Sequence, residues 1–497
     1  MTLVNKAKKI VGKVKTVLKS EKLYYSIAAL ICLCNAIFIF DNAIWGDEGY
    51  SAILVRKCIG EILVGTAADV HPPLYYLILK IAVSIFGESV LVLHITSYLF
   101  FVGTCVLIMT FIRKKFGLIS AYLAILFVGW TDFGFVYSVE IRMYSMALFF
   151  ITLTFCMAYE VIENGRMNNW ICLAVFALLA GYTHYFALLA VAFMVFGVFI
   201  ICMVKRQNDI WKKIGIASAI CVVGYLPWLM AMITTVERTM EDFWLQVIPT
   251  FAECADVFLG AMSYSHKLLW ILWGLLLAYI CVNLWDILRN SCFLKEKIHI
   301  KGKMDIGIQM VTLGIWTYFC TAIIGIAVST YIRPILLVRY LFPMIVLGAI
   351  SLGTLIQYFA SKKKIRWLIL LAAMVLLLQI GKSGIDVYRK HFEEFCDRRK
   401  KTEVSLAEIK CYTEQGHIVL SNINHFDWTV LKYYYPNNFM HYNTLDEGKI
   451  NTAVILMGQK LSDKEKIEFE GDKYTLAFIN QGQIDNTEYY LYHLEKK

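Results

Sequence analysis

The sequence predicts an all-α polytopic membrane protein with a small α/β domain at its C-terminal end. Hydrophobic residues make up 59% of the 497 residues, charged residues only 17%, and the mean hydropathy is +0.60. Several apolar runs reach 18 residues, which is enough for a helix to cross the hydrocarbon core of a bilayer. After about residue 385 such runs stop and charged residues become frequent. We therefore expect about 11 transmembrane helices followed by a domain of about 110 residues, long enough for its own core.

The predicted order begins with a basic cytoplasmic tail, residues 1–22, which is either an amphipathic surface helix or a solvated segment. The transmembrane domain covers residues 23–384, and the extracytoplasmic α/β domain covers residues 385–497. No cleavable signal precedes the first apolar run, so this run is predicted to stay as a span. The predicted spans are 23–44, 90–112, 118–136, 145–162, 170–182, 186–204, 214–233, 268–287, 306–330, 341–359 and 367–381.

The distribution of basic residues predicts the orientation. With the N-terminus inside, the dense basic clusters between spans fall on the cytoplasmic side, as the positive-inside rule requires, and Arg56-Lys57 is the exception. The same argument explains the net charge of +10 without nucleic-acid binding. Many of the 14 cysteines lie inside apolar spans and are expected to be small buried hydrophobic residues rather than disulfide partners.

The C-terminal part alternates short β-type runs with polar helix-like segments. It is therefore read as α/β. The expected strands are 417–420, 452–457, 474–479 and 489–494, and the expected helices are 403–412 and 462–468.

A polar loop between the first two spans, residues 45–89, holds four carboxylates, and charge beside hydrocarbon usually marks a site. Asp47 and Glu48 directly follow the first span, and Asp69 precedes His71-Pro72-Pro73. We predict that Asp47, Glu48 and Asp69 are catalytic and that His71 binds substrate. The alternative for Asp47 and Glu48 is a solvated helix N-terminus with an acidic first turn. Glu61 lacks such neighbours and is expected to be solvated.

Pro73 is predicted to start a helix that runs to Phe86, because proline at the first helical turn costs no hydrogen bond. This helix is roughly 21 Å long and cannot cross a hydrocarbon core of about 30 Å. Tyr76, Lys80 and Ser84 form a polar stripe along it. We expect the helix to lie at the membrane interface, with Tyr76 as a substrate-binding residue.

Further polar residues are predicted at the outer ends of later spans. Arg142 lies there between Glu140 and Tyr144, and it either grips a phosphate with its planar fork or pairs with a nearby carboxylate. His184 is either a ligand or an interface anchor. The substrate-binding residues predicted from these positions are Glu140, Arg142, Tyr144, His184, Arg333 and Arg339.

Four stretches carry a family resemblance: GDEGYS, DVHPPLYYLILK, EIRMYS and VRYLFP. In that order they resemble membrane glycosyltransferases related to the protein O-mannosyltransferases and the lipid A aminoarabinose transferase, the glycosyltransferase 39-like group. The resemblance covers about residues 40–345. It implies the GT-C fold, a polyprenyl- or dolichyl-phosphate sugar donor, inversion at the anomeric carbon and carboxylates in the first outer loop. Asp47 matches the acidic catalytic position, whereas the C-terminal domain has no match to the β-trefoil insert of the eukaryotic enzymes.

The expected function is an integral-membrane inverting glycosyltransferase of the cell membrane. It would move a sugar from a polyprenyl-phosphate carrier to an extracytoplasmic glycan, lipid or protein of the cell envelope. Asp47 would act as general base, while Arg142 with Arg333 or Arg339 would stabilise the leaving phosphate. The loop carboxylates could hold a divalent cation, but no ligand spacing demands one. The alternatives are a transporter or lipid-linked sugar flippase, and an envelope polysaccharide polymerase or ligase that uses a diphosphate-linked oligosaccharide.

Overall fold

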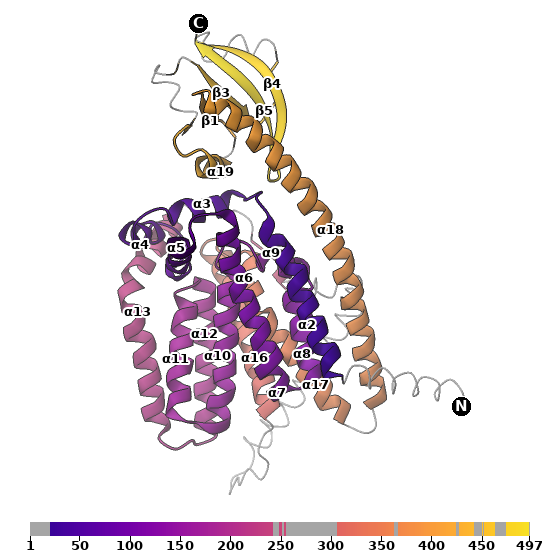
Figure 1. Cartoon of the computed structure of the whole chain (residues 1–497). Coiled ribbons are helices and arrows are strands. Elements are labelled where there is room, and N and C mark those ends of the chain that lie inside the picture. Colours follow the sequence, from indigo (N-terminus) through magenta and orange to yellow (C-terminus); the bar gives the residue numbers. More distant parts are fainter. Residues whose placement is uncertain are drawn as a thin grey trace, which may run out of the picture. The chain divides into compact units, whose positions relative to one another are not determined.

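The computed structural model describes residues 20–241, 248–250, 253–254, 306–361, 366–423, 427–441, 450, 452–462 and 474–496. They form two compact units, each built from separate stretches of the chain (Figure 1). Unit 1 comprises Met1–Cys32, Val102–Gly134 and Ala147–Tyr388, and unit 2 comprises Leu33–Phe101, Phe135–Met146 and Arg389–Lys497. The predicted eighth span, 268–287, and nearly all of the basic tail lie outside the described residues.

The described residues of unit 1 are almost entirely helical, because apolar sequence that is shielded from water satisfies its backbone groups within each helix. Among the described helices, α8 packs against α17, α12 against α16, and α11 against both α12 and α13. The described helices with residues in unit 1 are α2 (Glu21–Ala36), α6 (Val90–Leu107) with its extensions η2 (Ile108–Ile112) and α7 (Arg113–Phe116), α8 (Leu118–Gly129), α9 (Asp132–Tyr137), α10 (Tyr144–Asn164), α11 (Met167–Gly181), α12 (Tyr185–Val204), α13 (Ile210–Glu241), α16 (Ile306–Tyr331), η4 (Val338–Met344), α17 (Ile345–Ser361) and α18 (Arg366–Glu414).

The predicted membrane-protein class is confirmed, but the count of about 11 spans is not. Within the described residues, seven helical stretches are long and apolar enough to cross a membrane. The predicted spans 118–136 and 170–182 correspond to the shorter apolar helices α8 and α11, and the span 367–381 is the first part of α18.

The predicted span 118–136 is interrupted because a second helix starts inside it. Helix α8 ends at Gly129, and α9 (Asp132–Tyr137) follows. The Thr131 hydroxyl accepts a hydrogen bond from the Gly134 amide at 3.1 Å, which caps the new helix. A Cβ at Gly134 would lie 2.5 Å from the Val128 carbonyl oxygen, so the tight turn requires glycine there.

Unit 2 contains three short helices from the loop between the first two predicted spans, residues 45–89. They are α3 (Gly46–Leu54), α4 (Ile59–Ala67) and α5 (Leu74–Phe86). A glutamate at the third helical position accepts the backbone N–H that precedes α3 and α4: Glu48 from Trp45 at 3.2 Å, and Glu61 from Cys58 at 3.0 Å. Glu61 is thus a helix cap rather than a plain loop residue. The predicted helix after the proline pair is confirmed as α5, and its place at a membrane interface stays a prediction.

The C-terminal part of unit 2 contains a mixed five-stranded sheet in the order β2-β1-β3-β5-β4. Strand β1 pairs in parallel with β2 and β3, while β5 pairs antiparallel with β3 and β4. The strands are β1 (Ile418–Ser421), β2 (Phe439–His441), β3 (Thr452–Met457), β4 (Tyr474–Ile484) and β5 (Thr487–Lys496). All four predicted strands are present, whereas β2 and helix α19 (Asp427–Tyr434) were not predicted.

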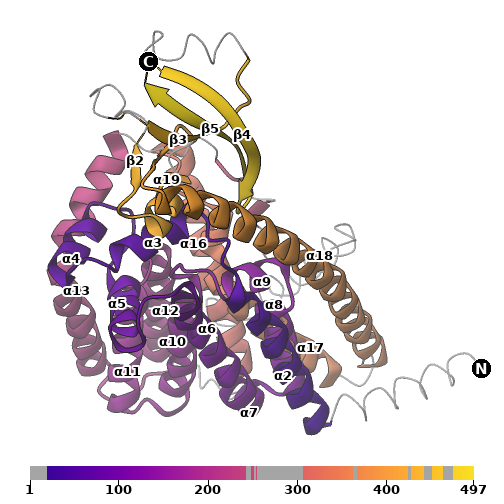
Figure 2. The same ribbon diagram turned by 45° about the horizontal axis from the view of Figure 1, so that its top comes forward.

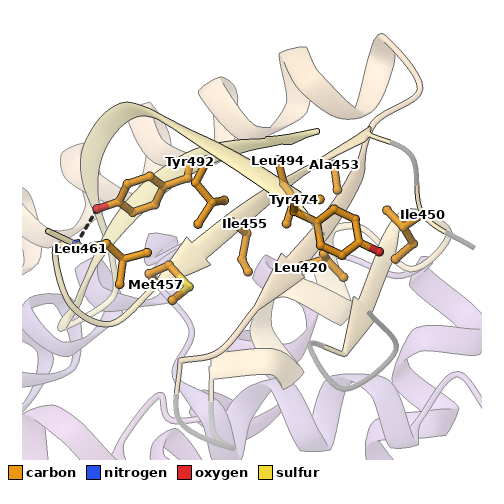
Figure 3. Packing of buried hydrophobic residues seen from close by; sticks show 10 residues of the cluster. Leu420, Ile450, Ala453, Ile455, Met457, Leu461, Tyr474, Tyr492 and Leu494 are labelled. Carbon is orange, nitrogen blue, oxygen red and sulfur yellow. Dashed lines mark hydrogen bonds between the residues drawn. The ribbon is translucent and has the colours of Figure 1, made fainter. Parts of the chain in front are cut away.

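The sheet has its own apolar core, as predicted for this part of the chain. Buried side chains from β1, β3, β4 and β5 pack on one another (Figure 3). The Tyr492 hydroxyl accepts a hydrogen bond from the Leu461 amide at 2.8 Å, so this buried phenol is satisfied. The predicted domain boundary at residue 385 falls inside α18, which also contains the predicted helix 403–412. The division into domains at that boundary stays a prediction.

Candidate active site

The predicted residues of the first outer loop meet those of the 140–144 turn inside unit 2. Helix α3 carries Asp47, the turn before α5 carries Asp69 and His71, and α5 carries Tyr76. All four surround Arg142, whose chain segment belongs to the same compact unit. The four residues lie 66 to 95 positions before Arg142 in the sequence but lie close to it in the structure. We call these four residues and Arg142 the Arg142 cluster.

Arg142 is buried, with a side chain only 4% exposed. Its Nη1 donates to the Tyr76 hydroxyl at 3.2 Å, and its Nη2 lies 3.8 Å from Oδ2 of Asp47. Nη1 also lies 3.5 Å from the Asp47 carbonyl oxygen and from the Ser51 hydroxyl. A buried guanidinium is stable only with such partners. This geometry supports the pairing of Arg142 with a carboxylate, which the sequence left open beside phosphate binding.

A directed hydrogen-bond chain connects Arg142 to Asp69 through His71. Nδ1 of His71 lies 3.2 Å from Oδ2 of Asp69, and the His71 ring lies 3.4–3.5 Å from Nη2 of Arg142. Because a guanidinium only donates, we assign Nε2 of His71 as the acceptor and Nδ1 as the donor to Asp69. Burial and the Arg142 charge lower the pKa of His71, which keeps the ring neutral.

Asp69 remains ionised in this arrangement. Burial by itself raises the pKa of Asp69, but the hydrogen bond from His71 and the charge of Arg142 outweigh it, and the pKa is about 2. Its side chain is 26% exposed, more than that of His71. Asp69 therefore presents a fixed negative charge at the edge of the Arg142 cluster.

Glu48 differs from its neighbour Asp47 in burial and in partners. Its side chain is 7% exposed, and that of Asp47 is 17% exposed. Oε2 of Glu48 accepts from the Trp45 amide, and Oε1 accepts from the Ile141 amide at 2.9 Å. Burial raises the pKa of Glu48, while His94 and these two amides act in the opposite direction. Glu48 therefore joins the start of α3 to the 140–144 turn.

Glu140 and Tyr144 flank Arg142 on that turn, and both are buried. Oε1 of Glu140 accepts a hydrogen bond from the Trp45 indole at 2.9 Å, a second connection between the turn and the residue before α3. The Tyr144 ring lies 4.8 Å from the Tyr137 ring, centroid to centroid.

The remaining predicted residues, His184, Arg333 and Arg339, belong to unit 1. His184 caps α12, because its Nδ1 accepts a hydrogen bond from the Phe186 amide at 3.1 Å. Tyr340 brings two of them together: its ring centroid lies 4.7 Å from that of His184 and 5.9 Å from Cζ of Arg339. Arg333 follows the end of α16.

The comparisons with known proteins agree on the fold. Residues 70–231, about a third of the chain, match the family model for dolichyl-phosphate-mannose-protein mannosyltransferase. The crystal structure of ArnT from Cupriavidus metallidurans in the apo state aligns with a TM-score of 0.56 at 11% identity, covering 95% of this chain and 97% of ArnT. ArnT bound to undecaprenyl phosphate aligns with a TM-score of 0.53 at 12% identity and the same coverage. The chain has the GT-C fold. No curated protein sequence matches it.

Within this GT-C chain, sequence reasoning missed one buried ionisable residue near the carboxylates. His94 of α6 donates from Nδ1 to the Val139 carbonyl oxygen at 2.8 Å, and the same nitrogen lies 3.9 Å from Oε1 of Glu48. His94 could have been found from the sequence, because it is an ionisable side chain inside an apolar run. Among the residues that the structure describes, no group of three or more His, Cys, Asp or Glu side chains is arranged to hold a metal ion.

Proposed function

We propose that this GT-C protein is a membrane glycosyltransferase that moves a sugar from a polyprenyl-phosphate carrier to an extracytoplasmic hydroxyl acceptor. The observation that carries the proposal is the partly exposed Asp47 beside buried Arg142, in a fold shared with an ArnT that binds undecaprenyl phosphate. The family model that matches residues 70–231 describes an enzyme with a lipid-phosphate sugar donor and supports the same class. The aliphatic carrier suits a chain whose helices are apolar enough to cross a membrane.

Asp47 is the proposed general base. A hydroxyl is a weak nucleophile, and removing its proton as it attacks typically contributes 10²–10⁴-fold to the rate. The new bond forms between the acceptor oxygen and the anomeric carbon, the bond from that carbon to the phosphate oxygen breaks, and Asp47 takes the proton. Attack from the face opposite the phosphate would invert the anomeric carbon. Asp47 suits this role better than Glu48, both of whose oxygens accept backbone N–H groups.

Arg142 is proposed to act on Asp47 as a positioning residue. Its contacts with Asp47, His71 and Tyr76 supply its charge with partners inside the protein. Stabilisation of the leaving phosphate then falls to Arg333 or Arg339, as their residue type suits a charge-assisted, bidentate contact. Asp69 and His71 are proposed to orient the sugar or the acceptor.

The test uses the full-length protein, purified and placed in lipid nanodiscs. Candidate polyprenyl-phosphate sugars are added, and release of polyprenyl phosphate is measured by mass spectrometry. We expect release with at least one sugar, and the sugar missing from envelope glycans of a deletion strain identifies which one to use. Release of a polyprenyl diphosphate instead would favour the polymerase or ligase. Movement of the intact lipid-linked sugar between leaflets without cleavage would favour the flippase.

A further inference from the structure

The C-terminal part of the chain contacts the first turn of the helix that carries Asp47 and the segments before and after this helix. In Figures 1 and 2, α19 lies beside α3, and both helices belong to unit 2. Four contacting residues come from α18 and α19, and a fifth residue, in the β4–β5 turn, pairs with one of them: Arg398, Thr429, Tyr433 and Tyr434, with Asp485 beside Arg398. We call these five residues the C-terminal clamp.

The closest contact lies within the first turn of α3. The Thr429 hydroxyl donates to the Gly46 carbonyl oxygen at 2.8 Å. A Cβ at Gly49 would lie 2.8 Å from that hydroxyl and 3.1 Å from the backbone of Thr429 and Val430. Gly49 is therefore required for the two helix backbones to approach so closely. Asp47 lies between these two glycines in the sequence.

Further contacts hold the chain segments that directly precede and follow α3. Before the helix, Arg398 pairs with Asp41 and lies 3.5 Å from Asp485, while the Tyr434 hydroxyl donates to the Asn42 carbonyl oxygen at 2.6 Å.

After the helix, Arg56 donates to the Tyr433 carbonyl oxygen at 2.8 Å, and its guanidinium lies 4.5 Å from the centre of the Tyr433 ring. The clamp therefore holds the segment before α3, the first turn of α3 and the segment after it.

We propose that the C-terminal clamp is part of the catalytic machinery, because it sets the position of Asp47, and that Thr429 is its central positioning residue. This inference rests on the proposed role of Asp47 as general base. A base must lie within hydrogen-bond reach of the proton that it removes, and a displacement near 1 Å can cost about a hundredfold in rate. The C-terminal domain thus contributes to turnover rather than only to stability.

The first test compares two Gly→Ala variants in the purified full-length protein. Gly49→Ala forces α19 away from α3, whereas Gly60→Ala, on exposed α4, meets no atom within 4 Å and is the matched control. We expect Gly49→Ala to lower kcat about tenfold or more with an unchanged donor KM, and Gly60→Ala to behave as wild type. If Gly49→Ala lowers only the melting temperature and leaves kcat at the wild-type value, the positioning role is refuted.

Two substitutions at Thr429 test its hydroxyl group, since one removes the hydroxyl and the other keeps it. Thr429→Val removes the hydroxyl and keeps the shape, and Thr429→Ser keeps the hydroxyl. We expect kcat to fall several-fold in the valine variant and to return in the serine variant, with faster amide exchange in residues 46–54 only in the former. If Thr429→Val and Thr429→Ser have the same kcat, Thr429 is not the positioning residue.

A cross-link tests the contact without any turnover. The 2.8 Å between a Cβ at position 49 and the γ-atom of residue 429 is close to the Cβ-to-far-sulfur separation of a disulfide, about 3 Å. In the double variant Gly49→Cys, Thr429→Cys the atom pair that clashes in Gly49→Ala becomes part of one disulfide, so this bond should form and peptide mass spectrometry should detect it. Absence of this disulfide refutes the clamp. A disulfide together with an inactive wild-type protein refutes the proposed function instead and leaves the contact standing.

Discussion

Nη2 of Arg142 lies 3.8 Å from Oδ2 of Asp47, although the two residues are 95 positions apart in the sequence. Both belong to one compact unit, and Arg142 is the more deeply buried of the pair. A buried, partnered cation beside a partly exposed carboxylate helps to fix the orientation of that carboxylate. A proposed general base requires a fixed orientation toward the proton that it removes.

Replacing Asp47 by Asn should abolish transfer and leave the fold intact. The amide keeps the size of the side chain but cannot accept the acceptor's proton, so kcat should fall by about 10²–10⁴-fold. Glu61→Gln is the control, because Glu61 lies in the same loop, residues 45–89, and caps α4. Polyprenyl phosphate release and thermal unfolding are measured for both variants. Near-normal turnover of Asp47→Asn would shift the base assignment to Asp69.

Arg142→Lys should lower the melting temperature and kcat and leave the donor KM unchanged. Lysine keeps the charge but loses the planar fork that reaches Asp47, His71 and Tyr76 together. Arg166→Lys, at an exposed position, controls for the substitution itself. A donor KM raised about ten- to a hundredfold at an unchanged melting temperature would instead match the loss of one charge-assisted bond to phosphate, worth about 1.5–3 kcal/mol. That result would show that Arg142 binds the donor phosphate instead of positioning Asp47.

Glu48→Gln should destabilise the protein more than Asp47→Asn does. Both Glu48 oxygens accept backbone N–H groups, and a glutamine amide offers only one acceptor oxygen. Leaving one buried N–H without its acceptor costs about 1–3 kcal/mol. Thermal unfolding of the two variants in the same detergent gives the comparison. A stable but inactive Glu48→Gln variant would point to a direct catalytic role for Glu48.

The hydrogen bond from His71 and the nearby charge of Arg142 predict that the contribution of Asp69 to stability depends on pH. Because the native pKa of Asp69 is about 2, below its ordinary value near 4, its contribution is fully present above about pH 4 and is lost as pH falls through 2. The melting-temperature deficit of Asp69→Asn relative to wild type should therefore be constant from pH 7 to pH 4 and shrink below pH 4. A deficit that stays constant down to pH 2.5 would show that the Asp69 charge does not stabilise the fold.

The predicted orientation can be tested by cysteine labelling in a background that lacks the native cysteines. Single cysteines at the exposed positions 60 and 488 should react with a membrane-impermeant reagent from outside, and one at the exposed position 114 should not. The basic cluster Arg113–Lys115 is the reason for placing position 114 inside. Labelling of the cysteine at position 114 in intact cells would show that the predicted orientation is wrong.

The sequence predicts the elements of this protein better than it predicts their contacts. Apolar runs and β-type alternation identify most of the helices and four of the strands, since both signals are local. The break between α8 and α9 was missed because a threonine cap and a close backbone approach interrupt an apolar run without changing its composition.

The candidate site was predicted as a set of polar residues at span ends, and the roles within that set depend on geometry. The sequence cannot tell that Glu48 accepts two backbone amides while the adjacent Asp47 keeps a more exposed side chain. Thr429 carried no sequence signal at all. Its importance depends on the packing of α19 against Gly49, far away in the chain.

Unit 2 is assembled from three separate stretches, and the third, Arg389–Lys497, is synthesised well after the other two. Thr429 follows Gly46 by 383 residues, which takes a ribosome about 20–80 s at 5–20 residues per second. During that time the nascent chain already carries Asp47 in α3 but lacks the residues that hold the helix. If Asp47 is the base, as proposed, a nascent chain that has not yet reached Thr429 lacks the contact that positions this base, so the base becomes fixed only late in synthesis.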